Sequence, residues 1–434
     1  MKRISQNKLL IFVGVILLII LVKNKFASSQ SASNQQKASS STIKALGENN
    51  SGQLGVSPND LDEGSHTISD LKNVSQVVAG RNFTLAKTDE GNVYVWGGND
   101  WGQLGLGSDE SRQDEPIENS TLKDSKKIAA SNNHVLAITK DGHVVSFGSN
   151  FSGQLGTGDN SDKNTPFQVA GIDDVKDVAP GYKFSIALKN DGTVWGWGAK
   201  CSDAKKKEAE SWWKTVIQTE ENQDAGYYDP TSDSLSIHDK NEYCINEDIV
   251  GILSRTPVQI KNLKNIVAIS SGYGHVLALD TEGNVWSFGC NTYKQLGRVT
   301  TDPKDNATPK KVEGLPPIAS LSAGYRHSLA LAKDGSLWGW GLNAHGQLGT
   351  VTNELMNVTP TKISVDHVAQ ILAGYDYSLI IKDDGSVWGW GMNIEEWFDK
   401  GDVEYTVEPK EVKGLKNVSQ LAAGGAHIIA LTND

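Results

Sequence analysis

The sequence predicts an all-β fold: a seven-bladed β-propeller closed by pairing of its N- and C-terminal half-repeats, with an N-terminal apolar helix before it. The first observation behind this prediction is a unit of about fifty residues that recurs along the chain. The second is that each end of the chain holds half of a further unit. The glycine that closes the Trp-Gly pair of the unit, or its equivalent, recurs at Gly97, Gly148, Gly198, Gly289, Gly341 and Gly391. These glycines mark six whole units, and the divided unit makes seven.

The divided unit indicates how the chain closes. Residues 415–434 match the first half of a unit and stop at Asp434, where the other units have an Asp-Gly turn. The second half stands near the N-terminus, at Thr42–Gly55. A last blade built from both ends leaves no unpaired sheet edge at the seam, whereas an open array would leave two. We therefore expect a closed ring.

Each unit contains three segments with the alternation of half-buried strands, as in Val418–Gly424, His327–Ala332 and Ser336–Gly341. An Asp-Gly or Glu-Gly pair before the third segment predicts a tight hairpin. Eight tryptophans fall in the third segment, and we expect them to pack the blades: Trp96, Trp195, Trp197, Trp286, Trp338, Trp340, Trp388 and Trp390. The wide gap between Gly198 and Gly289 predicts an insertion at about residues 199–254.

The motif order within the unit is clearest at Ala323–Gly349. It reads Ala-Gly-x-x-His-Ser, then Asp-Gly-x-Leu-Trp-x-Trp-Gly, then Asn-x-x-Gly-Gln-Leu-Gly. This pattern resembles the regulator of chromosome condensation repeat family over residues 42–434, the insertion apart. The resemblance implies the same seven-bladed propeller, and we interpret the chain as an exported, bacterial-type member.

Some units depart from this pattern. Ser131 replaces its first glycine, and residues 394–398 replace the Gly-Gln-Leu-Gly segment. Aromatic residues replace the histidine at Phe83, Phe184 and Tyr377. We expect altered local geometry in blades two and six within an unchanged fold.

The N-terminus predicts a membrane-targeting segment. Lys2, Arg3 and Lys8 precede an uninterrupted apolar run at residues 9–22. A helix of this length spans about 21 Å, which favours a signal-peptide core, whereas the lysines directly after it and the absence of a clear cleavage site favour an uncleaved anchor. We interpret residues 1–26 as a signal peptide or membrane anchor, residues 27–42 as a flexible Ser/Gln-rich tether, and residues 43–434 as the propeller. The propeller is then membrane-anchored and facing outside, or secreted if the segment is cleaved.

Net charge limits the classes of partner. The chain has a formal charge of −11, and residues 1–42 contain six of its Lys and Arg residues and no acid, so residues 43–434 carry −17. So acidic a body repels nucleic acid and anionic lipid. We therefore expect no nucleic acid partner, and membrane contact through the N-terminal segment alone.

The order of the strands predicts a binding surface. The loops between the first and second strands and the loops after the third strand should share one face, which we call the rim face. Aromatic and basic side chains, which are typical of binding hot spots, are frequent in these loops. The candidate partner-binding residues are Arg81, Asn132, Tyr182, Lys183, Tyr273, Tyr325, Arg326, Tyr375 and Asp376 from the first loops, and Trp101 and Tyr293 from the second, with Phe151 and His345 beside them. The alternative is that the tyrosines pack over the central channel.

Signals for chemistry are weak. His134, His275, His327 and His427 occupy the same strand start in four units, which favours inter-blade hydrogen bonds over catalysis or metal binding. No nucleophile elbow, phosphate-binding loop or His-Glu-x-x-His helix occurs. We therefore expect no enzymatic activity, no cofactor and no metal.

The insertion is interpreted in two halves. Residues 202–222 have the spacing of an amphipathic helix, with Trp212 and Trp213 on its apolar side, and residues 223–246 read as loop. Cys201 and Cys244 stand near its two ends and are candidates for a disulfide in an exported protein. Cys290 would then be the unpaired thiol, although three free thiols are the alternative.

These observations favour a non-catalytic platform outside the cytoplasm that binds a protein partner through the rim face and the insertion. The family resemblance adds the alternative of a regulator of a partner enzyme, similar to a nucleotide-exchange factor or to an inhibitor of β-lactamases. A carbohydrate-binding module is the third interpretation, and it depends on the aromatic rim alone.

Overall fold

In a computed structural model, the described residues are 41–60, 65–199, 254–300, 306–350, 354–393, 397 and 405–433. They belong to a compact unit that extends from Ser41 to the C-terminus. The predicted apolar segment, residues 27–40 of the predicted tether and residues 200–253 of the insertion, with Cys201 and Cys244, lie outside the described residues. Ser41 and Thr42, which were assigned to the tether, instead belong to the first strand, β1 (Ser41–Gly47). Within the described part, no helix is long and apolar enough to cross a membrane.

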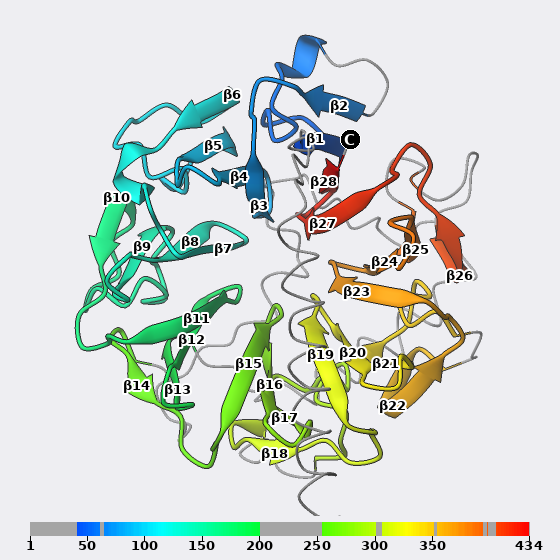
Figure 1. The fold of residues 1–434 in the computed structure, drawn as a ribbon. Helices are drawn as coiled ribbons and strands as arrows, with labels where there is room; N and C mark the ends of the chain where they lie inside the picture. Colours follow the sequence, from blue (N-terminus) through cyan, green and yellow to red (C-terminus); the bar gives the residue numbers. More distant parts are fainter. Residues whose placement is uncertain are drawn as a thin grey trace, which may run out of the picture. The chain divides into compact units, whose positions relative to one another are not determined.

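Seven four-stranded antiparallel sheets surround a common centre, as predicted (Figure 1). Blade 1 contains β3 (Val74–Ala79), β4 (Phe83–Thr88), β5 (Val93–Gly98) and β6 (Arg112–Glu118). Blade 2 contains β7 (Lys127–Ser131), β8 (His134–Ile138), β9 (Val144–Gly148) and β10 (Lys163–Gln168). Blade 3 contains β11 (Val175–Pro180), β12 (Phe184–Lys189), β13 (Val194–Gly198) and β14 (Val258–Gln259). Blade 4 contains β15 (Ile266–Ser271), β16 (His275–Asp280), β17 (Val285–Gly289) and β18 (Lys310–Lys311). Blade 5 contains β19 (Ile318–Ala323), β20 (His327–Ala332), β21 (Leu337–Leu342) and β22 (Met356–Ile363). Blade 6 contains β23 (Val368–Ala373), β24 (Tyr377–Lys382), β25 (Val387–Met392) and β26 (Tyr405–Glu411).

The seventh blade joins the two ends of the propeller and confirms the predicted closure. It contains β27 (Val418–Ala423), β28 (His427–Asn433), β1 (Ser41–Gly47) and β2 (Ser65–Ile68). β1 pairs with β28 along its whole length, from Ser41 opposite Asn433 to Gly47 opposite His427. The N- and C-terminal half-repeats therefore form one sheet (Figure 1).

The hydrophobic core lies between neighbouring blades. One cluster, for example, joins Phe83 and Leu85 of blade 1 to Ile128 and Val135 of blade 2. The tryptophans confirm the predicted packing: Trp96, Trp197, Trp340 and Trp390 have no exposed surface, and their counterparts two residues earlier in blades 3 to 6 are half-buried.

The recurring glycine after the third-strand aromatic residue has a steric cause. Gly97 has φ of +101°, and a Cβ atom there would lie 2.6 Å from the carbonyl oxygen of Asn82. Both the backbone conformation and the close approach of the first loop exclude a side chain.

Departures from the repeat change geometry locally, as predicted for blade 2. Ser131 pairs directly with His134, and Asn132 takes a φ of 37° to close this tight turn. The corresponding loop of blade 1 has the same length, with the amide of Gly80 donating to the carbonyl of Phe83 at 2.9 Å, but none of its residues takes a positive φ. Blade 6 nevertheless forms all four strands, although most of residues 394–398 lie outside the described part.

Candidate partner-binding face

The two sets of loops share one face, as their contacts across the blade junctions show. The guanidinium of Arg326, in the first loop of blade 5, lies 4.6 Å from the ring of Tyr293, in the second loop of blade 4. The ammonium of Lys183 in blade 3 lies 4.9 Å from the ring of Phe151 in blade 2. Side-chain hydrogen bonds from Asn82 to Ser51 and from Gln347 to Asp376 make the same kind of contact at two more junctions. At these four junctions the second loop of one blade lies against the first loop of the next.

Four tyrosine rings lie in succession along this face, with the two outer pairs stacked and the middle pair tilted by 51°. Tyr182, Tyr273, Tyr325 and Tyr375, from the first loops of blades 3 to 6, have successive ring centroids 4.2, 4.1 and 4.8 Å apart. We call this group the tyrosine arc. The hydroxyl of Tyr375 donates a hydrogen bond to Oδ1 of Asn132 in blade 2, so that the arc is joined to the far side of the ring.

Backbone hydrogen bonds hold the same loops together. The amide of Arg81 donates to the carbonyl of Asn132 at 2.9 Å, and the amide of Tyr325 donates to the carbonyl of Gly374 at 3.0 Å. The amide of Tyr182 donates to the carbonyl of Tyr273 at 3.2 Å. These hydrogen bonds join the first loops of neighbouring blades and make the inner edge of the rim face rigid.

The candidate residues differ in how much surface they offer. Tyr325, Asp376, Lys183, Asn132 and Tyr293 are buried, and Trp101 has 43% of its surface exposed. Arg81, Tyr182, Tyr273, Arg326 and Tyr375 are half-buried. For Tyr325 in particular, the geometry agrees with the alternative that the tyrosines pack over the channel. Among the aromatic candidates in the described rim loops, Trp101 and Phe151 are exposed, the latter at 44%. Tyr405, at the start of β26, is 47% exposed, and its ring lies 6.2 Å from that of His345 in a rim loop.

Two exposed side chains on the outer strands of blades 1 and 2 were not among the predicted residues. Phe167, on β10, is 45% exposed, and Ile117, on β6, is 41% exposed. Both stand on the outer strands of their blades, which vary in length and register between units, so no repeat pattern marks them in the sequence.

The histidines join adjacent blades, as predicted. Nε2 of His134 lies 3.0 Å from the hydroxyl of Ser185 in blade 3, and that hydroxyl donates to the carbonyl of Gln154 at 2.7 Å. The same carbonyl accepts the indole N–H of Trp197 at 2.9 Å. Equivalent histidine contacts join His275 to Ser328, His327 to Ser378 and His427 to Thr84.

Burial keeps these histidines neutral. Desolvation lowers the pKa of each of the four to about 3, so none is poised to exchange protons near neutral pH. Within the described residues, no group of three or more His, Cys, Asp or Glu side chains is arranged to hold a metal ion.

Whether a blade has histidine or an aromatic residue at this position depends on the residue that faces it from the next blade. Phe83 shares a buried cluster with Val135, Phe184 with Val276, and Tyr377 with Ile428. Where the next blade has an apolar residue in place of Ser or Thr, the histidine is absent, because its N–H would be buried without a partner. Tyr377 instead donates its hydroxyl to the carbonyl of Gly424 at 3.1 Å.

One expectation about the cysteines is corrected. Cys290, predicted to be the unpaired thiol, is disulfide-bonded. It follows the end of β17, and its amide donates to the carbonyl of Gly274 in the first loop of the same blade. Cys290 is therefore a cross-linked position at the rim face.

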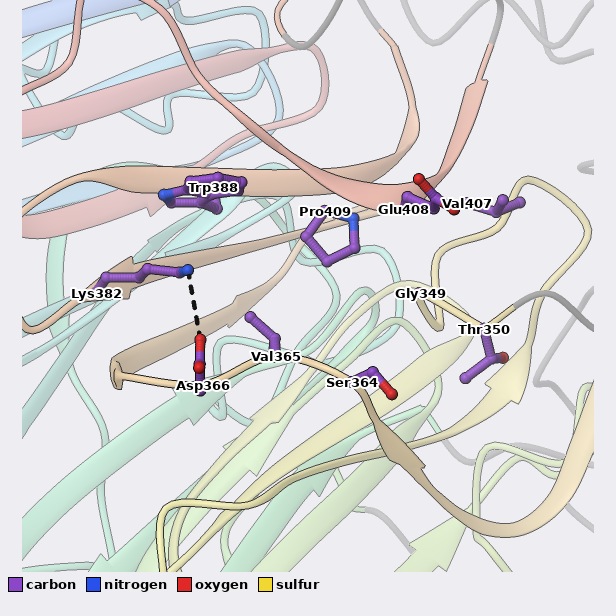
Figure 2. Close-up of a pocket in the computed structure, with 10 residues that line it drawn as sticks. All are labelled: Gly349, Thr350, Ser364, Val365, Asp366, Lys382, Trp388, Val407, Glu408 and Pro409. Atoms are coloured by element: carbon purple, nitrogen blue, oxygen red, sulfur yellow. Dashed lines mark ion pairs between the residues drawn. The ribbon is translucent and has the colours of Figure 1, made fainter.

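A surface depression of about 550 Å³ lies between blades 5 and 6 (Figure 2). On one wall, the ammonium of Lys382 lies 4.2 Å from the ring of Trp388 and 3.7 Å from a carboxylate oxygen of Asp366 (Figure 2). Blade 3 repeats this trio, with Lys189 beside Trp195 and Asp173. Because it recurs at the same strand positions, the trio is part of the blade structure, and it gives no sign of a catalytic site.

Comparisons with known proteins agree with this architecture. Two sequence models of the regulator of chromosome condensation (RCC1) repeat match the chain, one at residues 90–138, 141–188, 282–331 and 334–381 and the other at residues 74–103, 126–154, 266–295, 318–347 and 368–395. Together they cover more than half of the sequence.

Among curated proteins, the ultraviolet-B receptor UVR8 of Arabidopsis thaliana is 29% identical over 187 residues, which are 41% of this chain and 42% of the receptor. The probable E3 ubiquitin-protein ligase HERC3 of Homo sapiens is 39% identical over 94 residues, 21% of this chain and 9% of the ligase. The chain thus matches less than half the length of these relatives.

Solved structures share the fold. Human WBSCR16 superimposes with a TM-score of 0.71 at 20% identity, covering 91% of this chain and 100% of that one. Prp20p of Saccharomyces cerevisiae, described with its binding to Gsp1p and histones, superimposes with a TM-score of 0.69 at 20% identity, covering 91% and 92%.

Proposed function

Because the chain belongs to the regulator of chromosome condensation repeat family, we propose that it is a non-catalytic protein-binding platform that works outside the cytoplasm. The observation that carries the proposal is the rim face, where loops from consecutive blades meet and rigid backbone bonds fix them. A rigid ring that presents many independent loops on one side is suited to binding another protein.

The relatives support a protein partner. Prp20p is described as binding Gsp1p and histones, and a related yeast structure shows it with Kap60. By analogy, this chain either holds a protein in place or regulates a partner enzyme, as an exchange factor or a β-lactamase inhibitor does. HERC3 is a probable ligase, but its match is confined to 9% of its length. That short match gives no reason to assign ligase activity here.

Two features support a location outside the cytoplasm. The first is the sequence of the N-terminus, with its basic residues before an apolar run. The second is the disulfide at Cys290, because disulfides persist mainly in oxidising compartments. We propose that the chain is anchored in the membrane facing outside, or is secreted if the apolar segment is cleaved.

The proposal can be tested by cross-linking the full chain, tagged after Asp434, in intact cells and identifying captured proteins by mass spectrometry. We expect one partner whose capture is reduced by Arg326→Ala or by removal of residues 202–243. Asn190→Ala and Lys333→Ala, in the hairpins of the opposite face, are matched controls. Capture that depends on the control positions and not on the rim face would refute the face assignment.

A further inference from the structure

We propose that the flank of blades 1 and 2 binds a basic protein segment with apolar side chains. This inference rests on the proposed function, since it names the partner chemistry for one part of the rim face. The flank is defined by four exposed apolar side chains, Trp101, Ile117, Phe151 and Phe167, and by the carboxylates around them. We call it the acidic aromatic flank.

The first argument is the concentration of exposed apolar surface. In the described part of the chain, eight large hydrophobic side chains are exposed, and four of them lie between residues 101 and 167. The other four are scattered over blades 4 to 6. Isolated exposed apolar residues are ordinary on protein surfaces, whereas a group of aromatic ones marks an interaction site.

The second argument is that one segment, residues 160–167, connects the three aromatic side chains. The side-chain amide of Asn160 donates to the carbonyl of Phe151 at 3.1 Å. Asn164 packs against Gly102, next to Trp101, and its carbonyl accepts the amide of Gly107 at 2.7 Å. The same segment continues into β10, which carries Phe167. The aromatic residues of both blades are therefore held on one structural support.

The third argument is charge. Residues 101–118 and 151–167 contain seven acidic side chains, which are Asp109, Glu110, Asp114, Glu115, Glu118, Asp159 and Asp162. The same ranges contain two basic side chains. Arg112 is paired with Asp114 at 3.0 Å, and Lys163 with Asp159 at 3.0 Å. Both cations therefore have carboxylate partners. Lys183 of blade 3 adds a third cation, 4.9 Å from the ring of Phe151, and Asp162 accepts the amide of Asn150 at 2.6 Å. The exposed carboxylates of Asp109, Glu110, Glu115 and Glu118 still leave this surface with an excess of negative charge.

Together, the exposed apolar side chains and the excess of carboxylates indicate the chemistry of the partner. Carboxylates attract Lys and Arg side chains and repel nucleic acid and anionic lipid. The exposed ring of Trp101 offers a face for a cation and a surface for an aliphatic side chain. A segment that alternates basic and apolar residues satisfies both requirements.

The probe is a fluorescent synthetic peptide of alternating Lys and Leu, titrated with the full chain and followed by fluorescence anisotropy. A Glu-Leu peptide and a Lys-Ser peptide are matched probes. We expect the Lys-Leu peptide to bind, the Glu-Leu peptide to show no binding, and the Lys-Ser peptide to bind at least about tenfold more weakly. Equal binding of the Lys-Leu and Glu-Leu peptides would overturn the inference.

Substitutions locate the site. We expect Trp101→Ala and Phe151→Ala each to weaken Lys-Leu binding about tenfold, with an unchanged melting curve, because both side chains are on the surface. Val299→Ala, which removes an isolated apolar side chain that is 76% exposed, is the control and should leave the affinity unchanged. Combining Asp109→Asn with Glu115→Gln should weaken binding and reduce its dependence on salt.

Two results would overturn the inference: full affinity in both aromatic variants, or an unchanged salt dependence in the charge variant. Failure of the proposed function is distinguishable from failure of this inference. A cellular partner that is lost with Arg326→Ala and retained with Trp101→Ala would preserve the rim platform and remove the acidic aromatic flank from it. A cellular partner that is lost with Trp101→Ala supports both.

Discussion

His134 and Ser185 connect blade 2 to blade 3 through a hydrogen bond whose direction the structure determines. The serine hydroxyl donates its one hydrogen to the carbonyl of Gln154 at 2.7 Å, so it can only accept from Nε2 of His134, 3.0 Å away. The imidazole therefore carries its proton on Nε2. Four of the seven junctions use this arrangement. Two others pair Phe with Val, and the last pairs Tyr377 with Ile428.

The histidine and serine of a blade junction should be replaceable by apolar residues only when both are changed together. Ser185→Val alone leaves the N–H of His134 buried without a partner, and we expect it to lower the free energy of unfolding by about 1–3 kcal/mol. Adding His134→Phe creates the pair seen at Phe184 and Val276, and the double variant should be more stable than the sum of the single effects by about 0.5–3 kcal/mol. Urea denaturation of the four proteins measures this coupling, and additive effects would contradict it.

Acid should destabilise the propeller through the same histidines. Their pKa is about 3 in the folded protein, against 6.5 as the ordinary value, so between these pH values the unfolded chain binds more protons. The free energy of unfolding therefore falls as the pH drops below 6.5. With four such groups, the slope approaches roughly 5 kcal/mol per pH unit.

Urea midpoints measured between pH 4.5 and 6.5 test this dependence. The variant His134→Phe with Ser185→Val removes one of the four groups, so its slope should be smaller by about a quarter. A slope identical to that of the parent protein would show that the buried histidines are not its cause.

Ring closure should control thermal stability. Deleting residues 41–47 removes β1, whose Ile43 and Ala45 are fully buried, and leaves β28 paired with β27 alone. We expect a large fall in Tm by circular dichroism and a tendency to aggregate, because a strand edge becomes exposed. Deletion of residues 2–30, which keeps β1, is the control. An unchanged melting curve without β1 would refute the closed ring.

Alanine substitutions at Gly97 and Gly171 should distinguish the cost of backbone strain from the cost of a steric clash. Both have positive φ, of +101° and +79°, but a Cβ at Gly171 would meet nothing within 4 Å. We expect Gly171→Ala to cost about 1–2 kcal/mol through conformation alone. Gly97→Ala should cost about 1–3 kcal/mol more through overlap with the first loop, as measured by denaturation. Equal costs would show that the loop moves aside.

The location can be tested with reporters fused after Asp434. An alkaline phosphatase reporter, which folds only where disulfides form, should be active, since three basic residues precede the apolar run. A β-galactosidase reporter, which works in the cytoplasm, should be inactive. The reverse pattern would refute the proposed location and favour a partner inside the cell.

Much of the architecture was predictable because the strands, the hairpin and the glycine that ends the third strand of each repeat are encoded within one local stretch of sequence. The divided unit predicted the pairing of β1 with β28, although its strands lie at opposite ends of the chain. The role of His134 was also predictable, and the alternation of His–Ser with Phe–Val pairs was present in the sequence at a spacing of one unit.

The binding surface was only partly predictable. Sequence placed Tyr325 and Trp101 alike in rim loops, but folding buries the first in the tyrosine arc and leaves the second 43% exposed. It assigned Cys290 as a free thiol, whereas the cysteine is bonded.

The sequence by itself determined seven blades, their strand order and the seam, because these depend on residues within one unit and on the count of units. The tertiary structure decided which side chains of the rim face reach the solvent. Exposure of a loop residue depends on loops from other blades that converge on the same centre, as Tyr375 meets Asn132 across the ring. That convergence follows from the closure of the whole ring and from no single stretch of the chain.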